Sequence, residues 1–515
     1  MWQDLPISQK DEYKKLILAF SSLTEMFVQK NIDSNELPTP IINSKFQETV
    51  FQKVFCATAE DIGNTSYDVS LILKNDKEEI IKYLVGIKTF IFNSKEQKIA
   101  QFKSNSDEWG SLVLEIKDNA KNLKSKTEIV DINKDKYLEL AKKIATLRNA
   151  RINSSKANLR GFCIDSNDTI ESVYHTLMPT VQNNEPKIFV GETSYTEIDI
   201  DNIQILSCTT TKKPENFTFT DNKHTYKYTH SDSQLYMDFD NANIIKDEWR
   251  VVYAQNAYEI FSKIADEVYK NEKNVSPQID QSFSWKMELQ PSSGFNSFYG
   301  IGLKKKGKDQ RITSIQLFYN AFKNIVSDKI LTHIVKKLYL LANSSGKDDF
   351  AIRDEIIGLA KQVDNYEFIT KLNGFLFRPI NEIYIPIPHS KNFHQQNPNF
   401  FGKDIGLLDE KGTLKLPKEQ CSFDLVFDPS GTKIKAFITQ DFGKAIQSFG
   451  KQSELGKWIL REIFQLKEYE PLTQSRLDEI GINGIRLYKL KKDKNIYFQF
   501  IYIDDSNLPK DYFSW

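Results

Sequence analysis

The sequence has few of the residues that build metal clusters and disulfide frameworks. Its four cysteines, Cys56, Cys163, Cys208 and Cys421, form no C-x-x-C pair, and its six histidines are dispersed. This spacing argues against a zinc ribbon and a disulfide scaffold, and it is typical of proteins from a reducing compartment. We therefore expect a cytoplasmic protein.

Membrane spans and phosphate-binding loops are also missing. No apolar run reaches membrane length, and residues 1–4 include polar and acidic side chains, unlike a signal peptide. Residues 344–347 end in Gly-Lys but lack the upstream glycine of a phosphate-binding loop. We expect neither membrane association nor an ATPase motor.

The sequence lacks an excess of charge of either sign. Its 515 residues include 69 Lys and Arg and 69 Asp and Glu, so the formal net charge is zero. Any nucleic-acid surface must therefore be local and balanced by acidic residues elsewhere. The length predicts two to four domains, and a hydrophobic content of 40% is sufficient for their cores.

A helix followed by a β-hairpin is predicted between residues 45 and 90. Apolar residues recur at four-residue spacing in residues 45–55, which is typical of a helix. Two β-rich runs, residues 68–73 and 80–90, follow and are separated by a charged turn. Two such runs with a polar turn between them predict a hairpin.

The charged residues of this stretch are of the types that metal-assisted phosphodiester hydrolysis uses. Asp68 opens the first strand, Lys88 lies near the end of the second, and Glu48 lies on the helix. Carboxylates bind Mg²⁺ through oxygen, and the ion polarises the phosphate and activates a water molecule. A lysine orients that water or offsets charge on the phosphate. We expect Asp68, Lys88 and Glu48 to be catalytic, with Glu48 and Asp68 as the Mg²⁺ ligands.

Asp68, the run Gly86-Ile87-Lys88 and Glu48 resemble the motif of the PD-(D/E)xK nucleases. The resemblance implies a mixed sheet with flanking helices. The sequence departs from the family where Gly86 replaces an acidic residue, which removes one metal ligand. A competing acid-x-lysine, residues 115–117, lies in a segment that is also typical of a helix. The plainer alternative is that Asp68 caps a strand and Lys88 is a solvated edge residue.

The rest of the first 365 residues alternates between helical and β-rich patterns. Residues 134–152 predict a helix, and residues 148–161 read as a basic polar loop suited to phosphate contacts. Residues 162–239 show strand-like alternation and predict a β-rich extension. Two helices, residues 312–342 and 349–362, are expected to close this nuclease region, residues 1–365.

Short β runs return between residues 382 and 501, interrupted by one predicted helix at residues 453–463. Their spacing predicts a small barrel within residues 372–515. The fold class that follows is α/β (α+β), with an N-terminal mixed sheet, a β-rich extension and a C-terminal β pseudobarrel. Five motifs carry a further resemblance: residues 381–388, 440–446, 453–456, 488–489 and 497–500.

These motifs resemble the DNA-binding pseudobarrel of plant auxin-response transcription factors and of the EcoRII, BfiI and NgoFVII kind of restriction enzyme. The resemblance implies that two projecting segments, residues 389–401 and 440–457, hold the DNA major groove. Lysine and glutamine have the donor geometry for base edges. The candidate base readers are Lys391, His394, Gln395, Gln396, Gln440 and Lys451, and the candidate phosphate contacts are Lys444 and Arg461.

A DNA reader joined to a nuclease-like hairpin predicts a type II restriction endonuclease. We expect Mg²⁺-dependent, sequence-specific hydrolysis of double-stranded DNA in a restriction-modification system for phage defence. The analogy also implies a homodimer and a cognate DNA methyltransferase that forms no stable complex with the chain. Two alternatives remain open: a non-catalytic DNA-binding protein with a degenerate nuclease fold, which Gly86 favours, and a barrel that binds protein or peptide.

Overall fold

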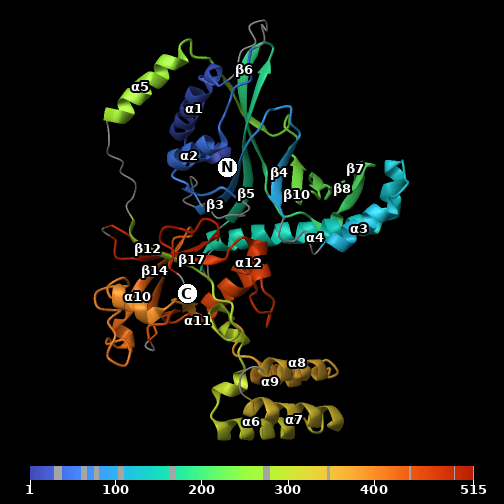
Figure 1. The fold of residues 1–515 in the computed structure, drawn as a ribbon, viewed down its shortest axis with the longest axis vertical. Helices are drawn as coiled ribbons and strands as arrows, with labels where there is room; N and C mark the ends of the chain where they lie inside the picture. The colour runs from blue at the N-terminus through green and yellow to red at the C-terminus, as the bar shows by residue number, and fades with distance from the viewer. Residues whose placement is uncertain are drawn as a thin grey trace.

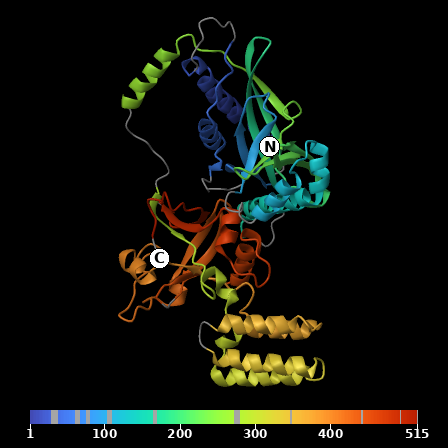
Figure 2. The same ribbon diagram turned by 45° about the vertical axis from the view of Figure 1, so that its right-hand side comes forward.

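The computed structural model describes residues 1–27, 37–59, 67–74, 80–102, 109–162, 169–270, 279–344, 348–439, 442–491 and 493–513. Within these residues, three β-sheets and a projecting group of helices build the molecule (Figures 1 and 2). The expected α/β (α+β) class is confirmed. Among the described helices, none combines the length and the apolar character that a membrane span requires.

The first sheet contains the predicted hairpin. Its order is β1-β2-β3-β5-β6-β11, and β2 and β3 pair antiparallel with Val69 opposite Val85. Strand β3 pairs parallel with β5, so the sheet is mixed. The strands are β1 (Thr58–Ala59), β2 (Val69–Lys74), β3 (Ile80–Thr89), β5 (Thr169–Gln182), β6 (Glu185–Ser194) and β11 (Ile245–Arg250).

Helices α1 (Ile7–Ser21) and α2 (Ser44–Phe55) cover one face of this sheet. Helix α2 begins after Asn43, whose side chain accepts a hydrogen bond from the Phe46 N–H and thereby caps the helix. Because successive strand residues point to opposite faces, Tyr83, Val85 and Ile87 of β3 all face these helices.

The opposite face of the first sheet packs against the second sheet and two helices, α3 (Gly110–Asn119) and α4 (Lys126–Arg160). The second sheet has the order β4-β10-β9-β8-β7. It contains only part of the expected β-rich extension at residues 162–239, because β5 and β6 of that range belong to the first sheet. Its strands are β4 (Glu96–Gln101), β7 (Gln204–Thr210), β8 (Lys213–Thr220), β9 (Thr225–Thr229) and β10 (Gln234–Asp238).

Helix α4 is 35 residues long and lies between the two upper sheets and the third sheet below them (Figure 1). Near its end, the Ala157 carbonyl accepts a hydrogen bond from the Trp458 indole N–H at 3.0 Å. Lys82 of β3 donates to the carbonyls of Leu159 (3.4 Å) and Arg160 (3.2 Å). One helix is therefore bonded both to the first sheet and to the C-terminal part.

The prediction of a basic loop at residues 148–161 is wrong, because this segment is the last part of α4, which ends at Arg160 and is followed by Gly161. Arg148 and Arg151 are buried. Arg148 donates to the Thr196 carbonyl and lies over the Tyr195 ring, and Arg151 lies over the Phe102 ring. These arginines hold elements together and are not available to a phosphate.

The third sheet is the C-terminal one, and its order is β12-β17-β18-β14-β15-β16-β13. Its strands are β12 (Ile279–Lys286), β13 (Ile385–Pro386), β14 (Ser422–Asp428), β15 (Thr432–Ile438), β16 (Ala445–Ser448), β17 (Gly484–Leu490) and β18 (Ile496–Ile501). The helical segments beside it are α10 (Ser390–Gln396), α11 (Gln452–Lys457), the π-helix η8 (Trp458–Ile463) and α12 (Gln474–Ile480).

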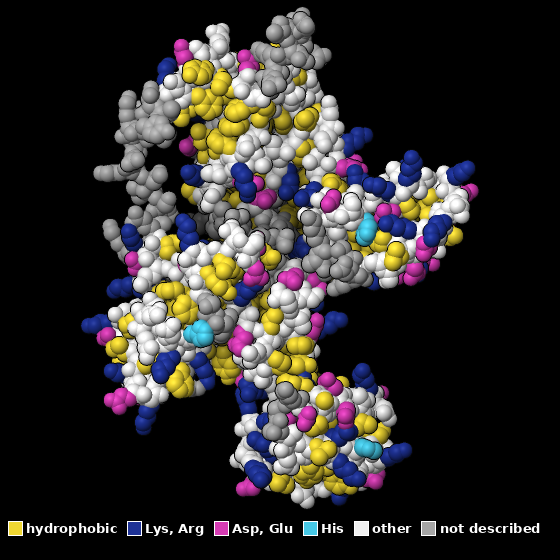
Figure 3. Space-filling model, viewed as in Figure 1, with side chains coloured by type: hydrophobic (Ala, Val, Ile, Leu, Met, Phe, Trp, Pro, Cys, Tyr) yellow, Lys and Arg dark blue, Asp and Glu magenta, His cyan; other side chains and the backbone are white. Residues whose placement is uncertain are grey.

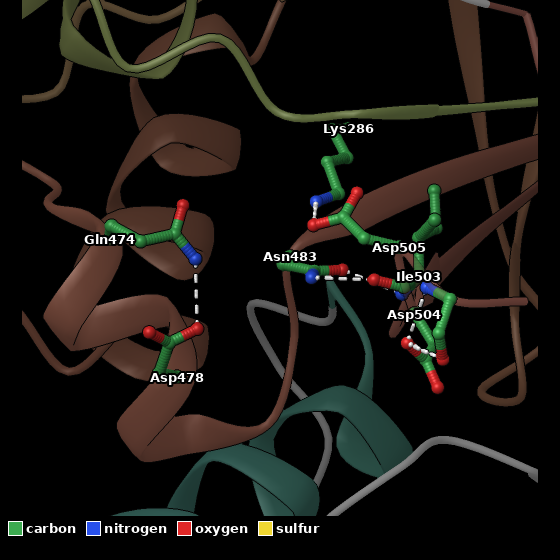
Figure 4. A network of polar contacts seen from close by, with 8 residues as sticks. Lys286, Gln474, Asp478, Asn483, Ile503, Asp504 and Asp505 are labelled. Atoms are coloured by element: carbon green, nitrogen blue, oxygen red, sulfur yellow. Dashed lines mark hydrogen bonds and ion pairs between the residues drawn. The ribbon is translucent and has the colours of Figure 1, made fainter. Parts of the chain in front are cut away.

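Strand β12 comes from the part of the chain that was expected to belong to residues 1–365. It pairs antiparallel with β17 over its whole length, with Lys286 opposite Gly484. Lys286 binds Asp505 at 2.6 Å, and the Asn483 side chain bonds both backbone groups of Ile503 (Figure 4). The third sheet thus starts at residue 279, well before the expected boundary between residues 365 and 372.

In the described part of the segment between β12 and β13, four α-helices project from the molecule (Figures 1 and 2). They are α6 (Lys308–Phe322), α7 (Asp328–Asn343), α8 (Asp349–Ala360) and α9 (Tyr366–Leu376). They enclose a core of their own, in which the buried Arg353 donates to the Tyr299 carbonyl at 2.6 Å. The helix expected at residues 312–342 is interrupted between α6 and α7.

A buried histidine makes the stability of the first sheet sensitive to pH. His175 of β5 is fully buried, bonds the Tyr13 hydroxyl at 3.1 Å and stacks on the Trp2 ring. Burial lowers the pKa of His175 to about 3. Below pH 6.5 the unfolded chain therefore binds a proton that the folded chain does not, and stability is lost as the pH falls.

We expect this residue to reduce the free energy of unfolding by about 2 kcal/mol between pH 7 and pH 5. Urea denaturation at both pH values, for the wild type and for His175→Gln, measures the effect. The variant should lose less stability on acidification than the wild type. An equal loss in the two proteins would show that other groups cause the pH dependence.

Candidate functional site

Helix α10 and the turn at residues 442–444 line an open, shallow groove of about 610 Å³ in the C-terminal part. Both elements belong to the two segments that were expected to project. The residues that line the groove are His389, Ser390, Lys391, Asn392, Gln395, Phe442 and Lys444. Figure 3 shows several lysine and arginine side chains on the side of the molecule where Figure 1 places α10.

The groove is held in shape by His394, which was expected to read a base. His394 is fully buried, and its Nε2–H donates to the Gly443 carbonyl at 2.8 Å. Burial lowers the pKa of this imidazole, so it is neutral at pH 7. A ring buried at this position does not reach a base edge, and its contact with Gly443 fixes α10 against the turn.

Gly443 is required for this contact. Its φ is +58°, and a Cβ at this position would lie 2.3 Å from the His394 Nε2. On the other side of α10, Phe393 packs among the rings of Phe283, Phe400 and Phe513. The buried faces of α10 are thus fixed, and Lys391 and Gln395 remain exposed on the groove.

The other expected DNA contacts lie in different places. Gln396 is exposed but donates to the Asn392 side chain, and Lys451 is exposed before α11, away from the lining of the groove. Arg461 donates to the carbonyls of Ile380, Leu466 and Lys467, so it has a structural role in place of the expected phosphate contact. Gln440 lies outside the described residues.

The groove is also lined by four residues that the sequence did not single out: His389, Ser390, Asn392 and Phe442. His389 is exposed in the left-handed conformation, with φ 39°, and Phe442 is 44% exposed with φ 53°. An exposed aromatic ring between polar neighbours at a turn is the signal that would have selected Phe442.

Comparison with known families supports a DNA-binding role for this part of the chain. Residues 384–491 match the family model of the NgoFVII C-terminal B3-like DNA-binding domain, a domain of restriction enzymes. The matched residues include β13 to β17 and the whole groove, and they confirm the resemblance expected for the C-terminal part. The match does not include the first or the second sheet. No curated protein matches the chain.

Asp68 and Lys88 lie together at the end of the β2–β3 hairpin that is opposite its turn. The Asp68 N–H donates to the Val85 carbonyl, and its Oδ2 accepts a hydrogen bond from the Ile87 N–H at 2.6 Å. The Lys88 Nζ lies 4.0 Å from the same oxygen, and each side chain is about one-third exposed. The strand register fixes this pair and leaves both groups accessible to a substrate.

Glu48 does not join this pair. Thr89 donates to the side chain of Gln47 on α2, so residue 89 points toward that helix. Its neighbour Lys88 therefore points to the opposite face of the sheet. Glu48 itself forms an ion pair with Lys45 at 2.8 Å. The expected ligand pair of Glu48 and Asp68 is thus divided between the two faces.

A close contact with a neighbouring ring explains why residue 86 is a glycine. A Cβ at this position would lie 2.7 Å from two ring carbons of Tyr174, which is opposite Gly86 in the parallel pair of β3 and β5. The Tyr174 ring is stacked on Tyr195 with centroids 4.2 Å apart. An acidic side chain at residue 86 does not fit beside this ring.

The residues around Asp68 and Lys88 fit a magnesium ion only in part. In the described part of the chain, no three His, Cys, Asp or Glu side chains lie together as a metal site. Mg²⁺ is often held by one or two carboxylates together with substrate phosphates and water. Asp68 supplies one such carboxylate, so a bound ion would depend on phosphate oxygens from DNA.

The competing acid-x-lysine at residues 115–117 lies on helix α3. Residues two apart on a helix do not face each other. Accordingly, Glu115 pairs with Lys136, and Lys117 pairs with Glu215 at 3.3 Å. This motif does not form an acid–lysine pair, and the hairpin pair remains the better candidate.

Proposed function

We propose that the chain binds specific sequences of double-stranded DNA through the groove between α10 and residues 442–444. The observation that carries this proposal is that the family match and the groove coincide. Lys391 and Lys444 supply positive charge for phosphates, and Gln395 supplies an amide for a base edge. The exposed Phe442 ring gives apolar contact, for example with a thymine methyl group.

Gln395 and Lys444 should have different effects on DNA binding. Gln395→Ala should reduce the preference for the cognate sequence by about 1–3 kcal/mol, because a lost base contact affects only the right base. Lys444→Ala should weaken binding to all sequences and lower the salt slope by about one, because a phosphate contact releases counterions. Competition binding with cognate and scrambled duplexes at two salt concentrations measures both effects.

Gln396→Ala and Lys451→Ala are the matched controls. Both residues are exposed and belong to the two segments expected to contact DNA, but neither lines the groove. Neither control should change discrimination. If Gln395→Ala leaves discrimination unchanged while Gln396→Ala relaxes it, the reading face of α10 is not the one that lines the groove.

We further propose that the chain is a type II restriction endonuclease that hydrolyses DNA with Mg²⁺. The 4.0 Å approach of Lys88 to Asp68 supports this proposal. Asp68 would hold the ion, which supplies polarisation of the phosphate and activation of water. The Lys88 ammonium donates hydrogen bonds, so it positions the attacking water or offsets charge on the phosphate.

Two features favour a second function: Gly86 stands where the nuclease motif has an acidic residue, and Glu48 lies on the other face of the sheet from Asp68. With only Asp68 as a ligand, the first sheet would be a degenerate nuclease fold in a DNA-binding protein. Digestion of a sequenced phage genome with Mg²⁺, and again with EDTA, separates the two functions. Mapped ends at one repeated sequence support the nuclease, whose partners would be a second copy of the chain and a methyltransferase for the same sequence.

A further inference from the structure

A second pocket, of about 510 Å³, lies next to the groove, and Lys444 lines both. We call it the Arg378 pocket. Its lining residues are Glu288, Ser292, Ser293, Gly294, Ser297, Arg378, Tyr384, Pro386, Ile387, Thr439, Lys444 and Ala445. The Ile387 N–H donates to the Lys444 carbonyl at 2.9 Å, so the wall of this pocket is bonded to the turn that lines the groove. A DNA strand in the groove would therefore lie beside this pocket.

The backbone of Arg378 is fixed at this pocket. Its N–H donates to the carbonyls of Phe298 (3.1 Å) and Gly300 (2.8 Å), at the end of the 3₁₀-helix η5 (Gly294–Tyr299). Arg378 and Ser292 both approach Gly300, where a Cβ would lie 2.8 Å from the Arg378 Nε and 2.9 Å from the Ser292 Cβ. The guanidinium group and the serine thus lie close together in the wall of the pocket.

The charge of Arg378 is neutralised only in part by the protein. Its Nη1 lies 3.5 Å from the Glu382 carboxylate, which accepts shorter hydrogen bonds from Lys305 (2.7 Å) and from the Tyr384 hydroxyl (3.0 Å). One carboxylate is therefore shared between two cations. The Arg378 side chain is 27% exposed, and its buried Nε has no hydrogen-bond partner among the described residues. Because a guanidinium group has five N–H donors, Arg378 has donors left for an anion.

The chemistry of the Arg378 pocket fits a phosphate group. Among the residues that line it, Arg378 and Lys444 are cations, and Glu288 is the one carboxylate. Glu288 accepts a hydrogen bond from the Ser293 hydroxyl at 3.1 Å. A guanidinium group matches the geometry of phosphate oxygens, and serine hydroxyls are further donors to them. Since the pocket adjoins the groove, the backbone of DNA bound there is the nearest source of a phosphate.

We propose that the DNA-binding surface extends from the groove into the Arg378 pocket, where Arg378 binds a backbone phosphate outside the sequence that the groove reads, with the Ser292 hydroxyl beside it. This inference rests on the proposed DNA-binding function. The family match begins at residue 384, so Glu288, Ser292 and Arg378 lie outside the matched domain. Residues on either side of the helices α6 to α9 thereby add a DNA contact to that domain.

Arg378→Gln tests this contact, because it removes the charge and keeps a polar side chain. Binding should weaken by about 10-fold for all sequences alike, and the slope of log affinity against log salt should fall by about one. Ethylation of single phosphates locates the contact. Ethylation of one phosphate beside the recognition sequence should weaken binding by the wild type and leave binding by Arg378→Gln unchanged. The duplex for both measurements is a genomic fragment that the wild type selects.

Glu288→Gln should have the opposite effect, because it removes a negative charge beside the bound phosphate. Binding to all sequences should strengthen by about 2–5-fold. Glu367→Gln on α9 makes the same change in net charge at an exposed position that does not line the pocket, and it should leave the affinity unchanged. Arg461→Gln removes an arginine that donates to backbone carbonyls, so it should lower the melting temperature and leave the salt slope unchanged.

The outcomes separate this inference from the function on which it rests. A wild type that binds no genomic fragment overturns the proposed DNA-binding function, and the role of Arg378 with it. A wild type that binds, with Arg378→Gln equal to it in salt slope and in its response to ethylation, overturns only the role of Arg378. If Arg378→Gln does not fold, Glu288→Gln decides, and an affinity equal to that of the wild type overturns the inference.

Discussion

Lys88→Ala and Asp68→Ala should each abolish cleavage of duplex DNA and leave DNA binding nearly unchanged. The expected loss is at least about 100-fold, because each change removes a charged group next to the reacting phosphate. In the proposed function, DNA binds the groove at α10, which belongs to a different part of the chain from the first sheet. Plasmid nicking with Mg²⁺ measures cleavage, and gel-shift titration without Mg²⁺ measures binding.

Two controls make this prediction specific. Lys117→Ala removes the lysine of the competing motif, and Glu48→Ala removes the carboxylate on the other face of the sheet. Neither should reduce cleavage as strongly as Lys88→Ala. If Lys88→Ala still cuts and Lys117→Ala does not, the candidate active site lies on α3 and the hairpin pair is structural.

A fragment of residues 279–515 should fold and bind specific DNA, whereas a fragment of residues 372–515 should not fold stably. The shorter fragment lacks β12 and with it Trp285, which is fully buried in the core of the third sheet. Loss of a buried tryptophan side chain costs about 3–5 kcal/mol, and the exposed edge of β17 invites aggregation. Circular dichroism melts and gel shifts with genomic DNA fragments compare the two.

Trp285→Ala in the longer fragment is the control for this comparison, because it removes the ring and keeps the strand. It should lower the melting temperature without removing DNA binding at low temperature. Equal melting temperatures for the two fragments would show that the DNA-binding domain starts near residue 372, as the sequence alone had suggested.

Local patterns in the sequence were sufficient for elements that neighbouring residues determine. The hairpin of β2 and β3 follows from two β-rich runs and one polar turn. The sequence did not reveal why residue 86 is glycine, because the Tyr174 ring reaches it through the parallel pairing of strands that are distant in sequence. Strand β12 was missed for the same reason, since its partner β17 follows the inserted helices.

Residue type alone gave wrong predictions for polar side chains that are buried in the structure. Arg148 and Arg151 were predicted to lie in a solvated loop, yet carbonyl groups and aromatic rings surround them in the core. His394 and Arg461 likewise bond to carbonyls of neighbouring segments. A sequence shows that such side chains can donate hydrogen bonds, but only the packed structure shows whether DNA or the protein accepts them.

The path of α4 has a consequence for where such a nuclease would cut. The helix is bonded to β3, the strand of Lys88, through Lys82, and to the DNA-binding part through Trp458. A continuous helix rises by about 1.5 Å per residue and does not stretch like a loop. Both contacts lie within four residues at the end of α4, from Ala157 to Arg160, so a single rigid helical turn joins the two parts. In the proposed nuclease this short, rigid connection would keep the hydrolysed phosphate at a fixed distance from the bound sequence, so every recognition site would be cut at the same number of base pairs from its edge.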